Sequence, residues 1–415
     1  MSESTRTAEL DLSIALYSGL FVRHDAVSNS LRCKLDVLEG LKERGARIGM
    51  TVFTQGTDYS GDHVRVTPTV TDLLRQDAFW SADLHIYEFG MRYELFDSVF
   101  VVPDDRSILV VEHNTTPAEL VDDPVVRAGC EMAMIQRNNL SLATRVACVS
   151  EFNLDIARSV GVPEDRLSVL HLPPGHSEAP TTRRGPGTAQ GPVRLLYLGR
   201  FVRAKGIGDL LDAVERLWEE GDDRFTLTVA GNPQFSDNAV LNRVRTSVER
   251  FGPQGKVRMV LRPSDAEVSE LFASAHVLVI PSYHEGYCVP VVEALGAGCY
   301  VIGYDVANLP NVTGGLGTLV PAGDVTGLRT AIDDFVDRIR AAPNGSAARL
   351  HTGRGELEYD AWTAAVTAHL RDYSESAFER RFLGLLEVLA RKSSAGLRPG
   401  LGEVIHRRMT EVCEQ

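Results

Sequence analysis

Two basic residues, Arg200 and Lys205, stand five positions apart within the segment Gly199–Gly206. A short apolar run precedes this segment and a helical pattern follows it, so both cations belong to a loop that opens a helix. Such a loop can direct its cations at a diphosphate, and the helix N-terminus adds oriented N–H groups and a positive dipole. We therefore interpret Arg200 and Lys205 as candidate diphosphate ligands. The alternative is a solvated basic turn, and Arg203 between them is expected to be solvated.

Two carboxylates, Glu285 and Glu293, form the second candidate group. Gly286 permits a close approach of the backbone to a ligand, and Pro290 suits the first turn of a helix. Glu285 should then lie in a loop and Glu293 on the helix that follows it. Carboxylates accept hydrogen bonds from paired hydroxyl groups such as those of ribose and other sugars. The alternative is that Glu285 caps the helix and Glu293 is a surface residue.

Strand-like runs alternate with amphipathic helical patterns around both groups, which is typical of βαβ units and parallel sheets. In the first half, the first strand is expected at Ser13–Tyr17, with Gly19 in the loop after it. The tail from about residue 326 to residue 415 is expected to be nearly all helical. The second half should contain five parallel strands, at Val193–Leu198, Thr226–Ala230, Val257–Leu261, Val277–Ile280 and Tyr300–Gly303.

Composition and charge exclude several classes of protein. The 415-residue chain is 44% apolar and has a net charge of −13, which favours a folded protein and argues against general nucleic-acid binding. Residues 1–175 contain 26 Asp and Glu against 16 Lys and Arg, so an anionic bilayer should repel this half. No apolar run approaches membrane-span length, and residues 1–10 lack the apolar core of a signal peptide. The six cysteines form no C-x-x-C pair, so we expect a cytoplasmic protein without stable membrane insertion.

The two groups together form a more specific pattern than either alone. A strand followed by G-R-x4-K-G and, about eighty residues later, by E-x7-E resembles the signature of the retaining glycosyltransferase family 4. In the first half, residues 112–119 (E-H-N-T-T-P-A-E) resemble the H-N-I-T-P-x-E element of one branch of that family. Residues 149–153 (V-S-E-F-N) resemble the S-E-F-N that follows in the same branch.

The resemblance implies the GT-B fold, an α/β architecture of two Rossmann-like domains that face a central cleft. Residues 1–175 would form the acceptor-binding domain, residues 176–192 a linker, and residues 193–374 the domain that binds a nucleotide sugar. The helical C-terminal tail, from about residue 375 to residue 415, would cross back to the first domain.

The resemblance also assigns roles in the second half. Arg200 and Lys205 would hold the donor diphosphate and its developing charge, and Glu293 would bind the ribose hydroxyls. The transferred sugar would be held by Glu285 together with three backbone N–H groups, those of Gly286, Tyr287 and Cys288.

In the first half, His113 would sit near the donor sugar and the reaction centre, and Gly19 would approach the phosphates or the acceptor. A core histidine bonded to backbone is the alternative for His113. The stretch 87–94, placed after a strand, could line the acceptor site or pack its aromatic rings. The family is thought to use front-face attack, so no catalytic base is assigned.

The expected activity is a retaining transfer of a hexose or N-acetylhexosamine from a nucleotide sugar, with UDP favoured, to a small soluble acceptor. The acidic first half suggests a neutral or cationic acceptor, such as an aminocyclitol. The donor is a co-substrate and no other cofactor is implied. No D-x-D triplet occurs, so a metal held by that motif is not expected. The alternatives are a GT-B glycoside phosphorylase, a lipid- or polysaccharide-directed transferase of cell-envelope synthesis, and a non-catalytic protein that retains the fold.

Overall fold

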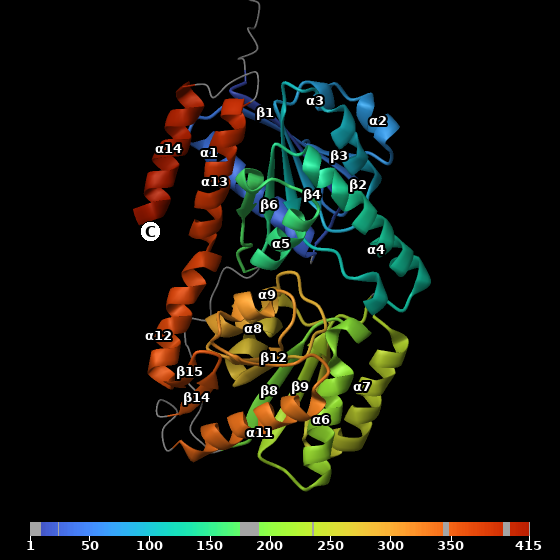
Figure 1. Ribbon diagram of the computed structural model, residues 1–415, viewed down its shortest axis with the longest axis vertical. Coiled ribbons are helices and arrows are strands. Elements are labelled where there is room, and N and C mark those ends of the chain that lie inside the picture. Colours follow the sequence, from blue (N-terminus) through green and yellow to red (C-terminus); the bar gives the residue numbers. More distant parts are fainter. Residues whose placement is uncertain are drawn as a thin grey trace, which may run out of the picture. The chain divides into compact units, whose positions relative to one another are not determined.

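The computed structural model describes residues 10–23, 25–174, 191–234, 236–342, 348–392 and 399–414. The chain forms two compact units (Figure 1). Unit 1 comprises Met1–Thr115, Ala128–Pro173 and Ser374–Gln415, and unit 2 comprises Thr116–Arg127 and Pro174–Tyr373. The predicted linker, residues 176–192, lies outside the described residues except for its last two positions.

Unit 1 is built on a seven-stranded parallel sheet in the order β3-β2-β1-β4-β5-β6-β7. Every residue of β4 and β5 is buried, as is usual for central strands of a parallel sheet that helices cover on both faces. The strands are β1 (Leu12–Phe21), β2 (Ile48–Thr57), β3 (Val64–Val66), β4 (Leu84–Phe89), β5 (Ser107–Glu112), β6 (Arg145–Cys148) and β7 (Leu167–Val169).

The helices of unit 1 come from both ends of the chain. The long α1 begins after Asp25, whose carboxylate accepts a hydrogen bond from the Ser28 N–H at 2.9 Å and so caps the helix. The C-terminal helices α13 and α14 run side by side and contact α1 (Figure 1). The helices are α1 (Ala26–Glu43), α2 (Val70–Leu74), α3 (Asp77–Trp80), α4 (Pro124–Gln136, which starts in unit 2), α5 (Glu151–Ser159), α13 (Glu375–Lys392) and α14 (Pro399–Glu414).

An aromatic cluster fills the core of unit 1. The Tyr17 and Tyr87 rings stack at 4.2 Å between centroids, and Phe89 and Tyr93 pack into the same cluster. The stretch 87–94 was expected to follow a strand, but residues 87–89 form the end of β4. Tyr87 and Phe89 are therefore core side chains, because a strand buried on both faces leaves them no exposed side, and Tyr93 beyond the strand is buried in the same cluster.

Unit 2 is built on a six-stranded parallel sheet in the order β10-β9-β8-β11-β12-β13. Five strands were expected; the sixth, β13 (Thr318–Val320), is a short edge strand with too few residues for a recognisable apolar pattern. The other strands are β8 (Val193–Leu198), β9 (Phe225–Gly231), β10 (Val257–Leu261), β11 (Val277–Ile280) and β12 (Tyr300–Tyr304). The helices are α6 (Ile207–Glu219), α7 (Asn238–Phe251), α8 (Asp265–Ser274), α9 (Val289–Gly296), α10 (Leu309–Thr313), α11 (Val325–Ala341) and α12 (Tyr359–Leu370).

The tail after residue 326 is mostly helical, as expected, but it contains a β-hairpin. Strands β14 (Arg349–Thr352) and β15 (Gly355–Glu358) pair antiparallel through a turn at Gly353 and Arg354. The expectation of a tail that is nearly all helix is wrong at this point. Gly355 has φ of +100°, a backbone conformation that favours a tight turn over helix continuation.

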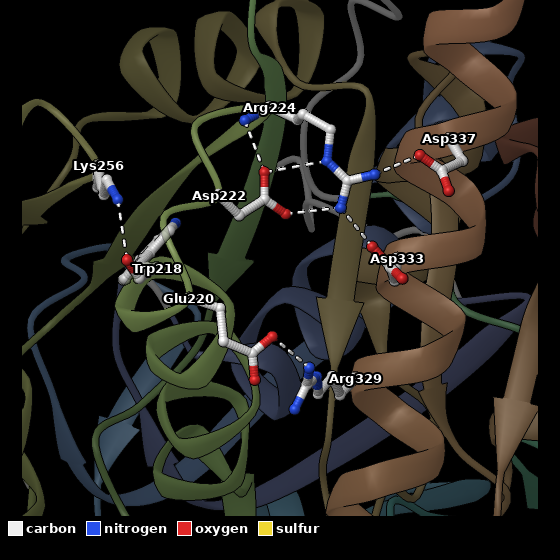
Figure 2. A network of polar contacts seen from close by, with 8 residues as sticks. All are labelled: Trp218, Glu220, Asp222, Arg224, Lys256, Arg329, Asp333 and Asp337. Carbon is white, nitrogen blue, oxygen red and sulfur yellow. Dashed lines mark hydrogen bonds and ion pairs between the residues drawn. The ribbon is translucent and has the colours of Figure 1, made fainter.

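A network of ion pairs joins α11 to the connection between α6 and β9 (Figure 2). The guanidinium of Arg224 bonds Asp222 at 2.7 Å and Asp333 at 2.5 Å, and it also pairs with Asp337. Arg329 on α11 bonds Glu220 at 2.7 Å. A single exposed pair contributes little to stability, but a shared network with one preorganised guanidinium contributes more. The network helps to hold α11 against α6.

Candidate functional site

The two loops that carry the predicted donor ligands leave the same edge of the unit 2 sheet. Strands β8 and β11 pair directly, with Leu195 opposite Val277, while β9 and β10 lie on one side of them and β12 and β13 on the other. The strand order therefore reverses between β8 and β11. Ligands of open α/β sheets bind beyond the carboxyl ends of the strands at such a reversal.

An ion pair joins the two loops. Lys205 Nζ lies 2.6 Å from Glu285 Oε1, and the side chains are 22% and 9% exposed. The Ser282 hydroxyl donates to the same carboxylate oxygen at 2.7 Å. Glu285 lies in the loop, as expected. Its carboxylate contacts the Lys205 ammonium and the Ser282 hydroxyl. A partly exposed ammonium in this position can be shared with an incoming anion.

Close backbone contacts fix the position of the Lys205 loop. Gly206 has φ of +64°, and a Cβ added to it would lie 1.8 Å from the Pro281 carbonyl oxygen. The Tyr283 N–H donates to the Ala204 carbonyl at 2.9 Å. Only glycine fits at position 206, because a side chain there would push the two loops apart.

A carboxylate with two tyrosines lies beside these loops, and sequence reasoning missed it. Asp209 Oδ2 accepts hydrogen bonds from the hydroxyls of Tyr283 and Tyr304, each at 2.6 Å. Burial, followed by the hydrogen bond to Asp209, raises the pKa of Tyr283 to about 12, so the Tyr283 phenol stays protonated at neutral pH. The three residues tie the first turn of α6 to the ends of β11 and β12. The isolated tyrosines and aspartate carry no motif, so no sequence signal could have joined them.

The loop before α9 is held by a second missed residue, Asn308. The Asn308 amide donates to the Tyr287 carbonyl at 3.2 Å, and its backbone N–H donates to the Glu285 carbonyl at 3.1 Å. Asn308 is buried and directly precedes α10. The burial of Asn308 is a property of the folded chain, and its local sequence carries no signal that marks it.

The residues at the start of α9 have distinct environments. Cys288 is the N-terminal boundary residue of α9 in a left-handed conformation with φ of +71°, and Pro290 lies in the first turn as expected. Burial, followed by the charge of Glu285, raises the pKa of the Cys288 thiol well above its usual range, so the thiol stays protonated. Gly286 is half-buried in the loop, and Glu293 is half-buried on α9.

The remaining basic residues of the motif differ from each other. Arg200 is exposed just beyond β8, where the Tyr197 hydroxyl donates to its carbonyl at 3.0 Å. Arg203 was expected to be solvated and is 52% exposed, but it is not free. Its guanidinium pairs with Asp122 at 3.1 Å and donates to the Glu119 carbonyl at 2.7 Å. Arg203 therefore anchors the segment of unit 2 that comes from the first half of the chain.

Gly19 belongs to unit 1 and lies inside β1, so its placement in a loop after the first strand is wrong. The strand does not end before Gly19. It continues to Phe21, because Leu20 and Phe21 remain in register with β2. A Cβ at Gly19 would lie 2.9 Å from the Tyr93 Cβ. A glycine is therefore favoured at position 19 because a larger residue would clash with the Tyr93 side chain.

His113 directly follows β5 and its ring bonds a carboxylate, not a backbone carbonyl. Nε2 lies 2.5 Å from Glu88 Oε2, and the His113 side chain is 4% exposed. The other Glu88 oxygen lies 2.8 Å from Lys34 Nζ. Burial raises the pKa of Glu88, but the charges and hydrogen bonds of Lys34 and His113 together outweigh it, so the net shift is downward and Glu88 is ionised.

Within the described ranges, no group of three or more His, Cys, Asp or Glu side chains is arranged to hold a metal ion. None of the described helices combines the length and the apolar character needed to span a bilayer.

Part of the chain is similar to one family of known proteins. Residues 178–343 match the family model described as Glycosyl transferases group 1. This segment contains Arg200, Lys205, Glu285 and Glu293.

Among curated proteins, the chain is 26% identical to the O-antigen chain mannosyltransferase B of Escherichia coli over 57% of its length. It is also 26% identical to the D-inositol 3-phosphate glycosyltransferase of Streptomyces avermitilis, over 88% of this chain and 78% of that protein. The chain spans 61%, 56% and 53% of the length of the first three curated relatives.

Among solved structures, the sucrose-phosphate synthase of Thermosynechococcus elongatus matches 91% of this chain and 99% of its own, with a TM-score of 0.63 and 19% identity. Anabaena HepE in complex with UDP-glucose matches 91% of this chain and all of its own, with a TM-score of 0.63 and 13% identity. These likenesses concern the fold. They confirm the predicted α/β, GT-B class with two Rossmann-like units and a helical C-terminal region.

Proposed function

We propose that this protein is a retaining glycosyltransferase that moves a hexose or N-acetylhexosamine from a nucleotide sugar to an acceptor hydroxyl. The observation that carries the proposal is the Lys205–Glu285 pair at the strand-order reversal of unit 2. It unites a cation suited to a diphosphate with a carboxylate suited to sugar hydroxyls. The group 1 match over residues 178–343 supports the same reading.

The proposed roles of the donor-site residues follow from the charges that develop when the donor is cleaved. Cleavage of a sugar–nucleotide bond creates an anionic diphosphate and a cationic sugar. Preorganised cations and helix N–H groups can then supply the largest catalytic contribution. In the proposal, Arg200 and Lys205 hold the diphosphate, Glu293 binds the ribose, and Glu285 binds the transferred sugar with the N–H groups of residues 286–288. The proposal includes front-face attack, in which the leaving phosphate accepts the proton of the acceptor hydroxyl, and it needs no resident metal or further cofactor.

Residues 193–374 would bind the donor and residues 1–175 the acceptor, with His113 and Gly19 on the acceptor side. We favour a UDP-sugar donor, since HepE has been solved with UDP-glucose. We favour a small soluble acceptor, because the relative that aligns over 88% of this chain acts on D-inositol 3-phosphate by its name. The acidic first half disfavours an anionic lipid surface and favours a neutral or cationic acceptor, so the acceptor should differ in charge from the anionic phosphate ester in the name of that relative. A cytoplasmic location fits such substrates.

A thermal-shift screen of the full chain against UDP-, GDP-, ADP- and dTDP-glucose tests the donor. A ligand present at about 100 times its dissociation constant should add roughly 2.7 kcal/mol of stability. We expect UDP-glucose to raise the Tm and the Lys205→Ala variant to lose that response. If none of the four donors shifts the Tm, while inorganic phosphate does, the glycoside phosphorylase alternative takes precedence.

The stereochemistry has a separate test. Proton NMR of the fresh product should show the anomeric configuration of the donor. An inverted product would refute the retaining assignment and leave the donor site intact.

A further inference from the structure

Lys34 is a fully buried lysine with a complete set of polar contacts. Its side chain is 0% exposed, and its ammonium lies 2.8 Å from Glu88 Oε1 and 2.6 Å from the Ser30 hydroxyl. The ammonium also lies 5.7 Å from the centre of the Phe378 ring on α13. Lysine is almost never fully buried unless it is paired, because removal of its charge from water is costly. Such a residue calls for an explanation beyond packing.

Glu88 extends this pair to His113. Its second oxygen, Oε2, lies 2.5 Å from His113 Nε2 and accepts a hydrogen bond from Ser30 at 3.2 Å. The three residues come from three elements of unit 1: Lys34 from α1, Glu88 from the end of β4, and His113 from the position after β5. Strands β4 and β5 are neighbours, so the row follows the carboxyl edge of the sheet.

The charges in the row determine what the imidazole does. An ionised Glu88 can only accept a hydrogen bond, so it holds a proton on Nε2 of His113. Were Glu88 alone, its buried negative charge would favour the protonated imidazolium as a counter-ion. Lys34 already neutralises that charge, so the row is electrically balanced with a neutral imidazole. In a neutral imidazole with its proton on Nε2, Nδ1 is an acceptor.

We propose that Lys34 and Glu88 are positioning residues for His113, which keep its imidazole neutral and present Nδ1 as an acceptor for a substrate hydroxyl. This inference rests on the proposed function, which places His113 at the reaction centre. A further titratable group beside Glu88 is the phenol of Tyr93, which directly precedes the 3-10 helix Glu94–Val101. Burial, then the nearby Tyr87 phenol, then the Glu88 charge raise the pKa of Tyr93, so it contributes no charge.

The charge and tautomer of His113 can be read without any substrate. Long-range ¹H–¹⁵N NMR of the full chain with ¹⁵N-labelled histidine distinguishes the two neutral tautomers and the imidazolium. A His113→Gln variant assigns the signal among the 11 histidines. At about pH 7.5, which lies within the range of about pH 5 to 8 where proteins are usually most stable, we expect the wild type to be neutral with its proton on Nε2. In Lys34→Met, we expect the change to imidazolium to occur at a pH higher by about one unit or more.

Two further variants keep the test decisive. Lys42→Met removes an exposed lysine of the same helix, paired only with Glu39 in the described structure, and should leave the signal unchanged. The double variant Lys34→Met/Glu88→Gln removes both buried charges and should restore the neutral, Nε2-protonated ring, even if the single variant folds poorly. The proposal is overturned if the wild-type ring carries its proton on Nδ1 alone or is an imidazolium at pH 7.5. It is also overturned if His113 titrates identically in Lys34→Met and the wild type.

Activity separates this inference from the proposed function. If transfer requires His113, the pH–rate profile of Lys34→Met should lose its acidic side at higher pH than that of Lys42→Met. A normal NMR result together with full transfer by His113→Gln would instead refute the role of His113 and leave the balanced row as a property of the fold.

Discussion

Lys205 and Glu285 come from loops eighty positions apart and form one ion pair, with Nζ 2.6 Å from Oε1. The pair unites the two halves of the predicted donor site before any ligand is bound. Because the ammonium is partly exposed, it can turn to an incoming phosphate while Ser282 continues to hold Glu285.

Replacement of Lys205 by alanine should lower kcat/KM for glycosyl transfer by roughly 10²- to 10³-fold, the usual cost of one preorganised charge-stabilising group. The matched control is Lys256→Ala in the same unit, because Lys256 lies outside the two loops and donates to the Trp218 carbonyl, at 3.2 Å, on the α6 side of the network in Figure 2. Steady-state kinetics of both variants check this. Equal rates for Lys205→Ala and the wild type would remove Lys205 from the site.

Alanine at Gly206 should destabilise the protein by at least about 2 kcal/mol, since it combines a left-handed backbone with a severe contact. The added Cβ would lie 1.8 Å from the Pro281 carbonyl oxygen. Two positions on, Gly208 has no neighbour within 4 Å of an added Cβ and lies within α6. Gly208→Ala should therefore stabilise the protein, by up to about 1 kcal/mol. Urea unfolding of both variants measures the contrast, and a tolerated Gly206→Ala would mean that the two loops are not in close contact.

Asn308→Ala should weaken the loop before α9. It removes the hydrogen bond to the Tyr287 carbonyl, and we expect a loss of about 1 to 2 kcal/mol in stability together with a higher KM for the donor. Asn311 donates to the Asn308 Oδ1 at 3.3 Å and is therefore unsuitable as a control, so the control is the exposed Asn242 on α7. Calorimetry and donor titration check the two effects. If Asn242→Ala raised KM as much as Asn308→Ala does, the loop would not depend on Asn308.

The buried Glu112 should make stability depend on pH. Burial, opposed by Arg137 and the Asn114 N–H, raises the pKa of Glu112 to about 7. A carboxyl group with a raised folded-state pKa contributes stability when protonated, and this contribution is lost as pH rises from the unfolded value of about 4.3 to about 7. The loss is on the order of 3 kcal/mol.

Glu112→Gln keeps the shape of the side chain and removes its ionisation. The Tm of Glu112→Gln minus the Tm of the wild type should therefore rise from about pH 5 to about pH 8, because the wild type loses the contribution of protonated Glu112 as Glu112 ionises. A Glu151→Gln variant, from a carboxyl whose pKa is lowered overall, should not show that trend. A constant difference for Glu112→Gln across this range would show that Glu112 is ionised throughout, as the partner of Arg137.

The sequence by itself determined the elements and the donor motif. The apolar periodicity of β8, β10 and β11 is local, so their predicted bounds match the observed ones. The same locality places Arg200 and Lys205 before α6, and Glu285 and Glu293 on either side of the start of α9. Short edge strands such as β13 and the β14–β15 hairpin escaped prediction, because three or four residues carry too little pattern.

Only the tertiary structure decided which side chains meet. Glu88 and Lys34 are 54 positions apart and carry no motif, and Asn308 is ordinary in its local sequence. They come together because strand order, not chain order, sets neighbours in a parallel sheet, so β4 lies beside both β1 and β5. The position of Gly19 was also decided by strand pairing. Hydrogen bonding to β2 extends β1 past the point where the apolar pattern of β1 ends. The sequence motif could thus indicate candidate donor-binding residues. The burial of His113 and the balance of charges around it depended on the folded chain.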